Sequence, residues 1–118
     1  MTDRELLEMA AKAAGHALVW GEKYAIGGDT VDCSDMPYIK SIHPDEFDAC
    51  WNPLTDDGDA LRLAVKLQIH VQPDGRYAWA STFEVNATEP VGGDPYAATR
   101  RAIVREAADL ARAGAQKG

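Results

Sequence analysis

The sequence predicts a single α+β domain with three main helices and a largely antiparallel sheet of about four strands. Two amphipathic helix patterns lie near the ends of the chain and a third lies at its centre. A hairpin pattern with a Pro-Asp-Gly turn separates the second helix from the third. With 118 residues, 46% hydrophobic and 26% charged, the chain can bury one core without disulfides or metals.

The first helix is predicted from Asp3 to about Ala14. Thr2 and Glu5 form a capping-box pattern, in which the hydroxyl accepts from a backbone amide of the first turn. Leucine, methionine and alanine then recur on one broad face, and Gly15 is a favourable residue just after a helix.

Short strands and an acidic loop are predicted next. Residues 16–20 and 24–26 have β-branched and aromatic content, and a turn at 21–23 would join them as a hairpin. Residues 27–50 are predicted to form an acidic, loop-rich insertion into the single domain 1–118. Alternating residues permit one further strand at 38–42 within this insertion.

The central stretch, WNPLTDDGDALRLAVKL at residues 51–67, predicts the second helix. Its proline disfavours helix at the preceding residue, while Thr55, Asp56 and Asp57 offer side-chain oxygens to the free amides of a helix start. The helix is therefore expected to begin within these three residues. The apolar residues expected to face the core are Leu61, Leu63, Ala64, Val65 and Leu67.

The hairpin at residues 68–85 is predicted to turn through a three-residue loop with a G1 bulge, centred on Pro-Asp-Gly. That register places Val71 opposite Tyr77 and Ile69 opposite Trp79, so the large apolar side chains share the core-facing side. The other face then carries smaller and mixed residues, namely Gln68, His70, Ala78, Ala80 and Thr82.

The last helix is predicted to start at Asp94-Pro95, with Asp94 as its N-cap and proline in the first turn. Residues 114–118 are expected to fray. The side chains predicted to face inward are Tyr96, Ile103, Ala107 and Leu110. Those predicted on the opposite side form an arginine stripe, namely Arg101, Arg105 and Arg112.

The net charge of −7 is unevenly distributed, because residues 29–59 contain nine acidic side chains and one lysine. Such a balance repels nucleic-acid phosphate and anionic membranes, and it can steer a basic partner, although solubility alone also explains it. The candidate interaction surface in this region combines acids with aromatic residues: Asp32, Asp35, Asp45, Asp48, Phe47 and Tyr38.

The sequence also predicts a cytoplasmic protein. No apolar run approaches the ~20 residues of a membrane span. The acidic start MTDRELLEMA lacks the pattern of a signal peptide. Cys33 and Cys50 are expected to be free thiols, since two cysteines without an export signal do not indicate a disulfide scaffold.

Clustered carboxylates at Asp56, Asp57 and Asp59 suit magnesium or calcium, but their spacing lacks the alternating ligands of an EF-hand, and a helix start explains all three. Cys33, His43 and Cys50 have no common zinc spacing. The chain contains no nucleophile-elbow, P-loop or dinucleotide motif, so no cofactor is expected.

The stretch WNPLTDDGDALRLAVKL resembles the signature of a family of small phage and prophage proteins of unknown function. The segments TDRELLEMAAKAAG and RRAIVREAADLARA are similar to the two ends of that family. The resemblance implies an α-β-α sandwich fold, a phage or prophage origin in a bacterial host, and an accessory role. It implies no activity and no catalytic residues.

The leading hypothesis is a non-enzymatic phage or prophage accessory protein that binds another protein. One alternative is a small metal-dependent enzyme that uses the acids at 56, 57 and 59. A second alternative is nucleic-acid binding through Arg101, Arg105 and Arg112, although three arginines on one helix also suit a solvated face.

Overall fold

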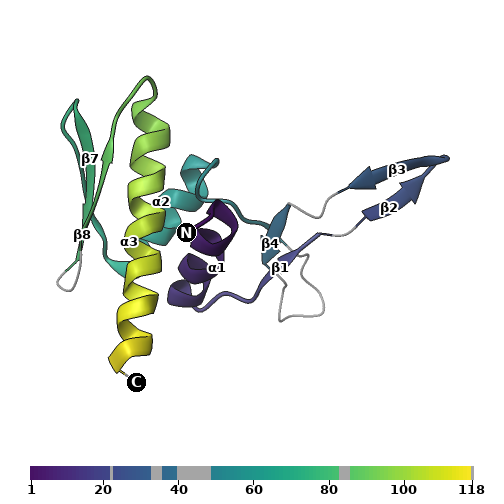
Figure 1. Cartoon of the computed structure of the whole chain (residues 1–118), viewed down its shortest axis with the longest axis horizontal. Coiled ribbons are helices and arrows are strands. Elements are labelled where there is room, and N and C mark those ends of the chain that lie inside the picture. The colour runs from purple at the N-terminus through teal and green to yellow at the C-terminus, as the bar shows by residue number, and fades with distance from the viewer. Residues whose placement is uncertain (22, 33–35, 40–48, 83–85, 118) are drawn as a thin grey trace. The chain divides into compact units, whose positions relative to one another are not determined.

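The computed structural model describes residues 1–21, 23–32, 36–39, 49–82 and 86–117. The chain forms two compact units, one made of Met1–His16 with Asn52–Gly118 and the other of Ala17–Trp51. The first unit contains three helices and a three-stranded sheet, and the described residues of the second unit form short strands (Figure 1).

Helix α1 spans Asp3–Ala14 and confirms the first predicted helix. The Thr2 hydroxyl accepts from the backbone N–H of Glu5 at 3.1 Å, which satisfies one of the free amides of the first turn. Gly15 ends the helix in the left-handed conformation, with φ of +75°, where a side chain would be strained. The buried side chains of α1 are Leu6, Leu7, Ala10, Ala11 and Ala14.

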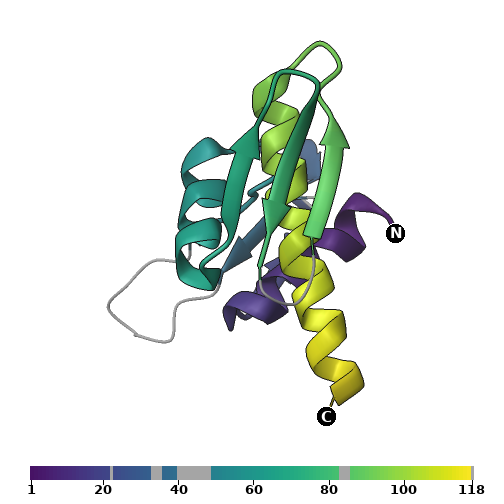
Figure 2. The ribbon, with the colours of Figure 1, turned by 90° about the vertical axis from the view of Figure 1, so that its left-hand side faces the viewer.

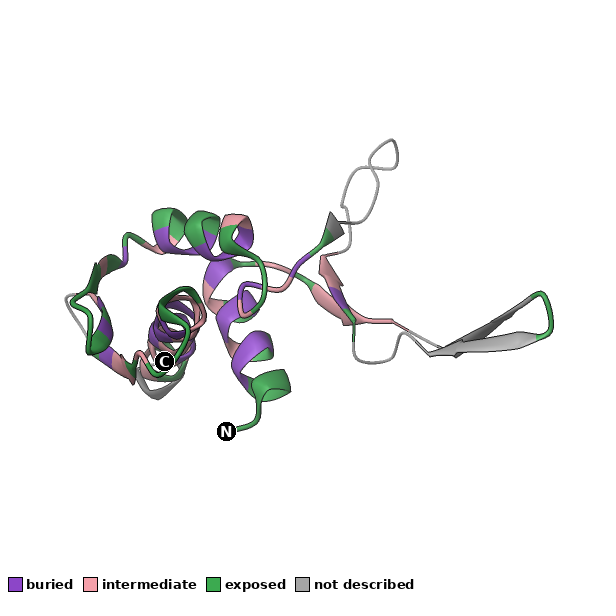
Figure 3. Ribbon diagram, turned by 90° about the horizontal axis from the view of Figure 1, so that it is seen from above, coloured by how far each residue is buried: buried purple, intermediate pink, exposed green. Residues whose placement is uncertain are grey.

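Helix α3, Pro95–Lys117, is the central element of the first unit. It lies between the sheet and α1, and it also contacts α2, Asp57–Leu67 (Figures 1 and 3). Ile103 and Ala107 are buried as predicted, but Tyr96 is exposed, and the helix continues through most of the predicted frayed tail. None of the described helices is long and apolar enough to cross a membrane.

The sheet of the first unit is antiparallel throughout, and β7 lies between the other two strands (Figure 2). Its strands are β6 (His70–Pro73), β7 (Tyr77–Ser81) and β8 (Asn86–Pro90).

The predicted register of the β6–β7 hairpin is wrong. Trp79 lies opposite Gln72, and the backbone N–H of Asp74 donates to the carbonyl of Tyr77 at 3.0 Å. Only Gly75 and Arg76 therefore form the loop, and the glycine has φ of +91°, as the first residue of a type II′ turn requires. Compared with the bulged loop, this register moves the side chains of β7 to the other face relative to β6.

The core-facing side of the sheet is consequently its alanine side. Ala78, Ala80 and Ala87 are buried, whereas Tyr77 and Trp79 are 44% and 42% exposed. The prediction that Trp79 is a core residue is therefore wrong. Small side chains on the sheet let α3 approach closely. The buried residues of α3 are also mainly small, and they include Ala98, Ala102, Val104, Ala107 and Ala108.

Helix α2 begins within the predicted three residues, but two residues of its predicted core face are placed wrongly. Leu61 and Val65 are 63% and 70% exposed, while Leu63 is buried. The start of the helix sets this rotation, because buried Asp59 must face the backbone N–H of Asn52. The residues on the inward face are Ala60, Leu63, Ala64 and half-buried Leu67, which follow the helical spacing.

The second unit differs from its predicted strand pairing. Strand β1, Leu18–Trp20, pairs with β4, Pro37–Ile39, which also pairs with β5, Ala49–Cys50. The hairpin forms instead between β2, Lys23–Ile26, and β3, Asp29–Asp32. Its loop is Gly27-Gly28, and both glycines have positive φ, which a type I′ turn needs. The predicted strand at 38–42 begins one residue earlier, and residues 40–48 lie outside the described part.

The α+β class, the three helices and the antiparallel pairing are confirmed. The strands differ in number, since the described residues form eight short strands in three sheets. Within the first unit, the described helices all lie on one side of the β6–β7–β8 sheet (Figure 3). The other side of this sheet carries no described helix.

We expect Ala80→Leu to destabilise the first unit by about 1–3 kcal/mol, because the added carbons have no room between the sheet and α3. Chemical denaturation monitored by far-UV circular dichroism measures the change. Gln72→Leu places the same side chain on the exposed side of the sheet and should change stability by less than about 0.5 kcal/mol. Equal effects of the two substitutions would contradict the close helix–sheet contact.

Candidate functional site

The side of the β6–β7–β8 sheet that faces away from α3 is here termed the outward face. Residues directly opposite each other on paired strands share a face. Gln72 and Thr88 lie opposite Trp79, and His70 and Asn86 lie opposite Ser81, so these residues all belong to the outward face. Its members are His70, Gln72, Tyr77, Trp79, Ser81, Asn86, Thr88 and Pro90. None of these side chains is an acid, a lysine or an arginine, although the chain as a whole is 26% charged.

Two exposed aromatic rings lie side by side on the outward face. The centroids of Tyr77 and Trp79 are 6.3 Å apart, and their planes meet at 62°, which is an edge-to-face arrangement. The indole N–H of Trp79 donates to Oδ2 of Asp74 at 3.1 Å. This hydrogen bond ties the ring to the hairpin turn and fixes its orientation.

Asp74 organises the turn with its side chain. Its Oδ1 accepts from the backbone N–H of Tyr77 at 2.8 Å and from that of Arg76 at 3.0 Å. These two bonds, followed by that from Trp79, lower the pKa of the Asp74 carboxyl, since each favours the charged form. The carboxylate therefore remains ionised at neutral pH beside the two aromatic rings.

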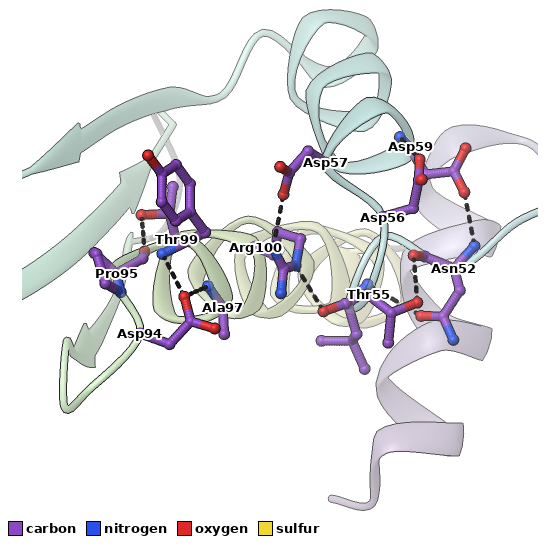
Figure 4. A network of polar contacts seen from close by, with 12 residues as sticks. Asn52, Thr55, Asp56, Asp57, Asp59, Asp94, Pro95, Ala97, Thr99 and Arg100 are labelled. Carbon is purple, nitrogen blue, oxygen red and sulfur yellow. Dashed lines mark hydrogen bonds and ion pairs between the residues drawn. The ribbon is translucent and has the colours of Figure 1, made fainter.

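The predicted metal-binding acids are each engaged in local contacts (Figure 4). Asp56 is the N-cap of α2, and its Oδ2 accepts from the backbone N–H of Asp59 at 2.8 Å. Oδ2 of Asp59 accepts from Asn52 at 2.9 Å, and Oδ1 accepts from Arg62 at 2.7 Å. Among the residues that the structure describes, no group of three or more acidic, histidine or cysteine side chains could hold a metal ion.

Of the other three predicted helix caps, one caps a helix through its side chain and two make other contacts. Thr55 is not a cap, since its hydroxyl donates to the carbonyl of Asn52 at 3.4 Å. Asp57 is the first residue of α2 and accepts from Arg100 at 2.7 Å (Figure 4). Oδ1 of Asp94 accepts from the backbone N–H groups of residues 96 and 97 and thereby caps α3.

The arginine stripe is largely used for contacts within the chain. Arg101 donates to Asp3 at 2.8 Å, and Arg105 donates to Glu89 at 2.6 Å. Arg105 also donates to the carbonyl of Thr88 at 3.2 Å, and Arg112 lies 3.8 Å from the carboxylate of its neighbour at 109. Each positive charge thus has an acidic group close by, which weakens its attraction for phosphate.

Most of the predicted acidic interaction surface falls outside the described part of the chain. Asp32 is the last residue of β3, opposite Lys23. Tyr38 is half-buried in β4, between Val19 and Cys50 on the neighbouring strands. The predicted members outside the described residues are Asp35, Asp45, Phe47 and Asp48.

The histidines and cysteines are not brought together in the described part of the chain. His70 is exposed on the outward face, and His16 is half-buried after α1, where burial lowers its pKa. Cys50 is an exposed free thiol. Cys33 and His43, the other predicted zinc ligands, lie outside the described residues.

A buried acid lies between α3 and the sheet. Glu106 is fully buried, and its Oε1 accepts from the hydroxyl of Thr82 at 3.2 Å, while Oε2 has no hydrogen-bond partner among the described residues. Burial raises the pKa of Glu106 to about 7, against the effect of the hydrogen bond from Thr82. A neutral carboxylic acid is therefore the form that suits this core below neutral pH.

Asp74, Tyr77 and Trp79 are not predicted as a group, because the expected register places both aromatic residues in the core. Two signals could have found them. The strand Tyr-Ala-Trp-Ala-Ser alternates large with very small residues, and the small side suits a closely packed helix. The aspartate before Gly75 can satisfy the amides of a two-residue turn with its own side chain.

Comparison of the chain with protein-family models, with curated proteins and with solved structures finds no match.

We expect Arg100→Met to destabilise the protein by about 1–3 kcal/mol. The Arg100 side chain is only 17% exposed, and it donates to the carbonyl of Leu54 at 2.9 Å as well as to Asp57. The substitution removes both of these hydrogen bonds. Arg112→Met, which removes an exposed arginine from the same helix, is the matched control and should have little effect. Denaturant titration compares the two variants.

Glu106→Gln should change how stability depends on pH. The folded protein holds the Glu106 proton up to about pH 7, whereas the unfolded chain releases it near 4.5. Stability from this group is thus complete below pH 4.5 and falls as the pH rises through 7, by roughly 1–3 kcal/mol. Glutamine stays neutral, so the melting temperature of the variant should rise relative to that of the wild type as the pH increases from 5 to 8, as thermal unfolding can measure.

The matched control for this titration is Glu8→Gln, which neutralises an exposed glutamate on α1. A difference between wild type and Glu106→Gln that stays constant across the pH range would contradict the neutral, buried carboxylic acid.

Proposed function

We propose that the chain is a non-enzymatic protein-binding module, an accessory protein of phage or prophage origin that acts in the cytoplasm of a bacterial host. We further propose that the outward face is its binding surface. The observation that carries the proposal is the pair of exposed aromatic rings, Tyr77 and Trp79, on a sheet face whose strand residues include no acid, lysine or arginine.

The composition of the outward face supports this use. The centres of protein interfaces are depleted in charge and enriched in tyrosine and tryptophan, and tryptophan and tyrosine are frequent hot spots. Trp79 lies on the central strand, with neighbours on both sides, and its orientation is already fixed by Asp74. A fixed ring loses little conformational entropy on binding, which favours affinity.

The net charge of −7 supports an approach by a basic partner. A field of this sign raises the encounter rate with a positively charged protein and repels nucleic acid. The acidic stretch 29–59 would then act at long range, whereas the outward face, with the Asp74 carboxylate at its turn end, makes the contact.

The rival functions have less support. The acids at 56, 57 and 59 already accept hydrogen bonds from a backbone amide or an arginine, which a metal ion would have to displace. The guanidinium groups of Arg101 and Arg105 already donate to carboxylates, which a phosphate would have to replace. The phage origin is supported by the resemblance of residues 51–67.

A photo-crosslinking amino acid tests the proposed surface in the source cells. Placed at Gln72, which is exposed and directly opposite Trp79, it should form an adduct with a partner protein under ultraviolet light. The same amino acid at exposed Lys12 on α1 is the control and should form little adduct. Mass spectrometry of the adduct identifies the partner, and twice the mass of the chain would identify a second copy.

The decisive comparison uses Trp79→Ala, which removes the central ring of the outward face. Because Trp79 is 42% exposed, the variant should remain folded, as circular dichroism can verify. We expect the adduct at Gln72 to be lost in this background. An adduct that persists unchanged, or equal adducts at Gln72 and Lys12, would overturn the proposal.

A further inference from the structure

We propose that the corner formed by Asp74, Tyr77 and Trp79 binds an arginine side chain of the partner protein. The inference rests on the proposed function and specifies the chemistry of the group recognised at the outward face. It follows from three features of the corner, namely the arrangement of the rings, the hydrogen bond to the indole and the free capacity of the carboxylate.

The two rings offer faces at an angle to each other. An edge-to-face pair covers at most one of its four ring faces, so Tyr77 and Trp79 at 62° leave ring surface open, and both side chains are more than 40% exposed. A planar guanidinium can stack on such a face, and cations are attracted by the negative face of an aromatic ring.

The hydrogen bond between Trp79 and Asp74 strengthens this attraction. The indole N–H donates to an ionised carboxylate at 3.1 Å, and hydrogen-bonded groups polarise one another. The direction of that polarisation adds electron density to the indole ring, which makes its face more attractive to a cation and less so to an anion.

The Asp74 carboxylate has room for one more donor. Oδ1 already accepts two backbone N–H groups, whereas among the described residues Oδ2 accepts one donor, the indole N–H. An arginine stacked on the indole can therefore donate one N–H to Oδ2, and such a bond between charged groups is stronger than a neutral one. Asp74 is also the one acid in direct contact with the outward face among the described hydrogen bonds.

The charge pattern favours a cation over other ligands. The outward face itself carries no arginine or lysine that could attract a phosphate or a carboxylate. The cation nearest in sequence is Arg76 in the turn, whose charge helps to lower the pKa of Asp74. Arg76 is therefore an internal competitor for the same carboxylate, and its removal should not weaken the binding of an external arginine.

Two capped peptides, Gly-Gly-Arg-Gly-Gly and the same peptide with citrulline in place of arginine, test the inference with the purified chain. Citrulline has nearly the shape of arginine but no charge. The readout is the indole N–H signal of Trp79 in nuclear magnetic resonance spectra, assigned by its loss in Trp79→Phe. The indole signals of Trp20 and Trp51 serve as internal references.

We expect the arginine peptide to shift the Trp79 signal saturably, at millimolar concentration, and the citrulline peptide to bind about two- to fivefold more weakly, the range of an exposed cation–π contact. Asp74→Asn keeps an oxygen for the turn amides but loses the charge, and it should weaken the binding of the arginine peptide by a similar factor. Arg76→Gln should leave binding unchanged or tighten it.

The inference is overturned if the two peptides shift the Trp79 signal equally, if neither shifts it at tens of millimolar, or if all three indole signals move together. These outcomes leave the crosslinking result at Gln72 unaffected, because a partner can bind the outward face without an arginine. Conversely, an adduct at Gln72 that persists unchanged in Trp79→Ala, or equal adducts at Gln72 and Lys12, would overturn the proposed function while the peptide titration still reports on the corner.

Discussion

The close contact between α3 and the alanine side of the β6–β7–β8 sheet is the constraint on which the first unit depends. Ala78, Ala80 and Ala87 have almost no exposed surface, and they meet a helix whose buried residues are also mainly small. Because dispersion attraction falls steeply with distance, small side chains stabilise the contact by letting the two backbones approach. The same contact decides which way the aromatic residues point, since Tyr77 and Trp79 alternate with these alanines.

Several elements could be predicted from the sequence because local interactions determine them. The capping pattern of Thr2 and Glu5 located α1, and the aspartates at 56 and 94 lie where helices begin. Side-chain oxygens bind the free amides of a helix start regardless of the rest of the fold, so these signals are readable from a few residues. The α+β class and the existence of the β6–β7 hairpin have the same local basis.

The faces of the elements could not be predicted in the same way, because distant residues decide them. The hairpin pattern allows two registers, and the observed one depends on the Asp74 side chain in the turn and on the helix that covers the alanines. In α2, two apolar faces compete, and the bond from Asn52 to Asp59 selects the face of Leu63. The candidate site at Asp74, Tyr77 and Trp79 was missed for this reason, since a tryptophan in an amphipathic strand is ordinarily placed in the core.

The position of α3 along the chain has a consequence for biosynthesis. The ribosome makes α1, α2 and the sheet first, at roughly 5–20 residues per second, and the helix on which they all pack follows them. The ion pair between Asp3 and Arg101 joins residues 98 positions apart, so it can form only after Arg101 has been translated. Until then Leu6 and Leu7, which are buried in the folded chain, have no α3 to pack against.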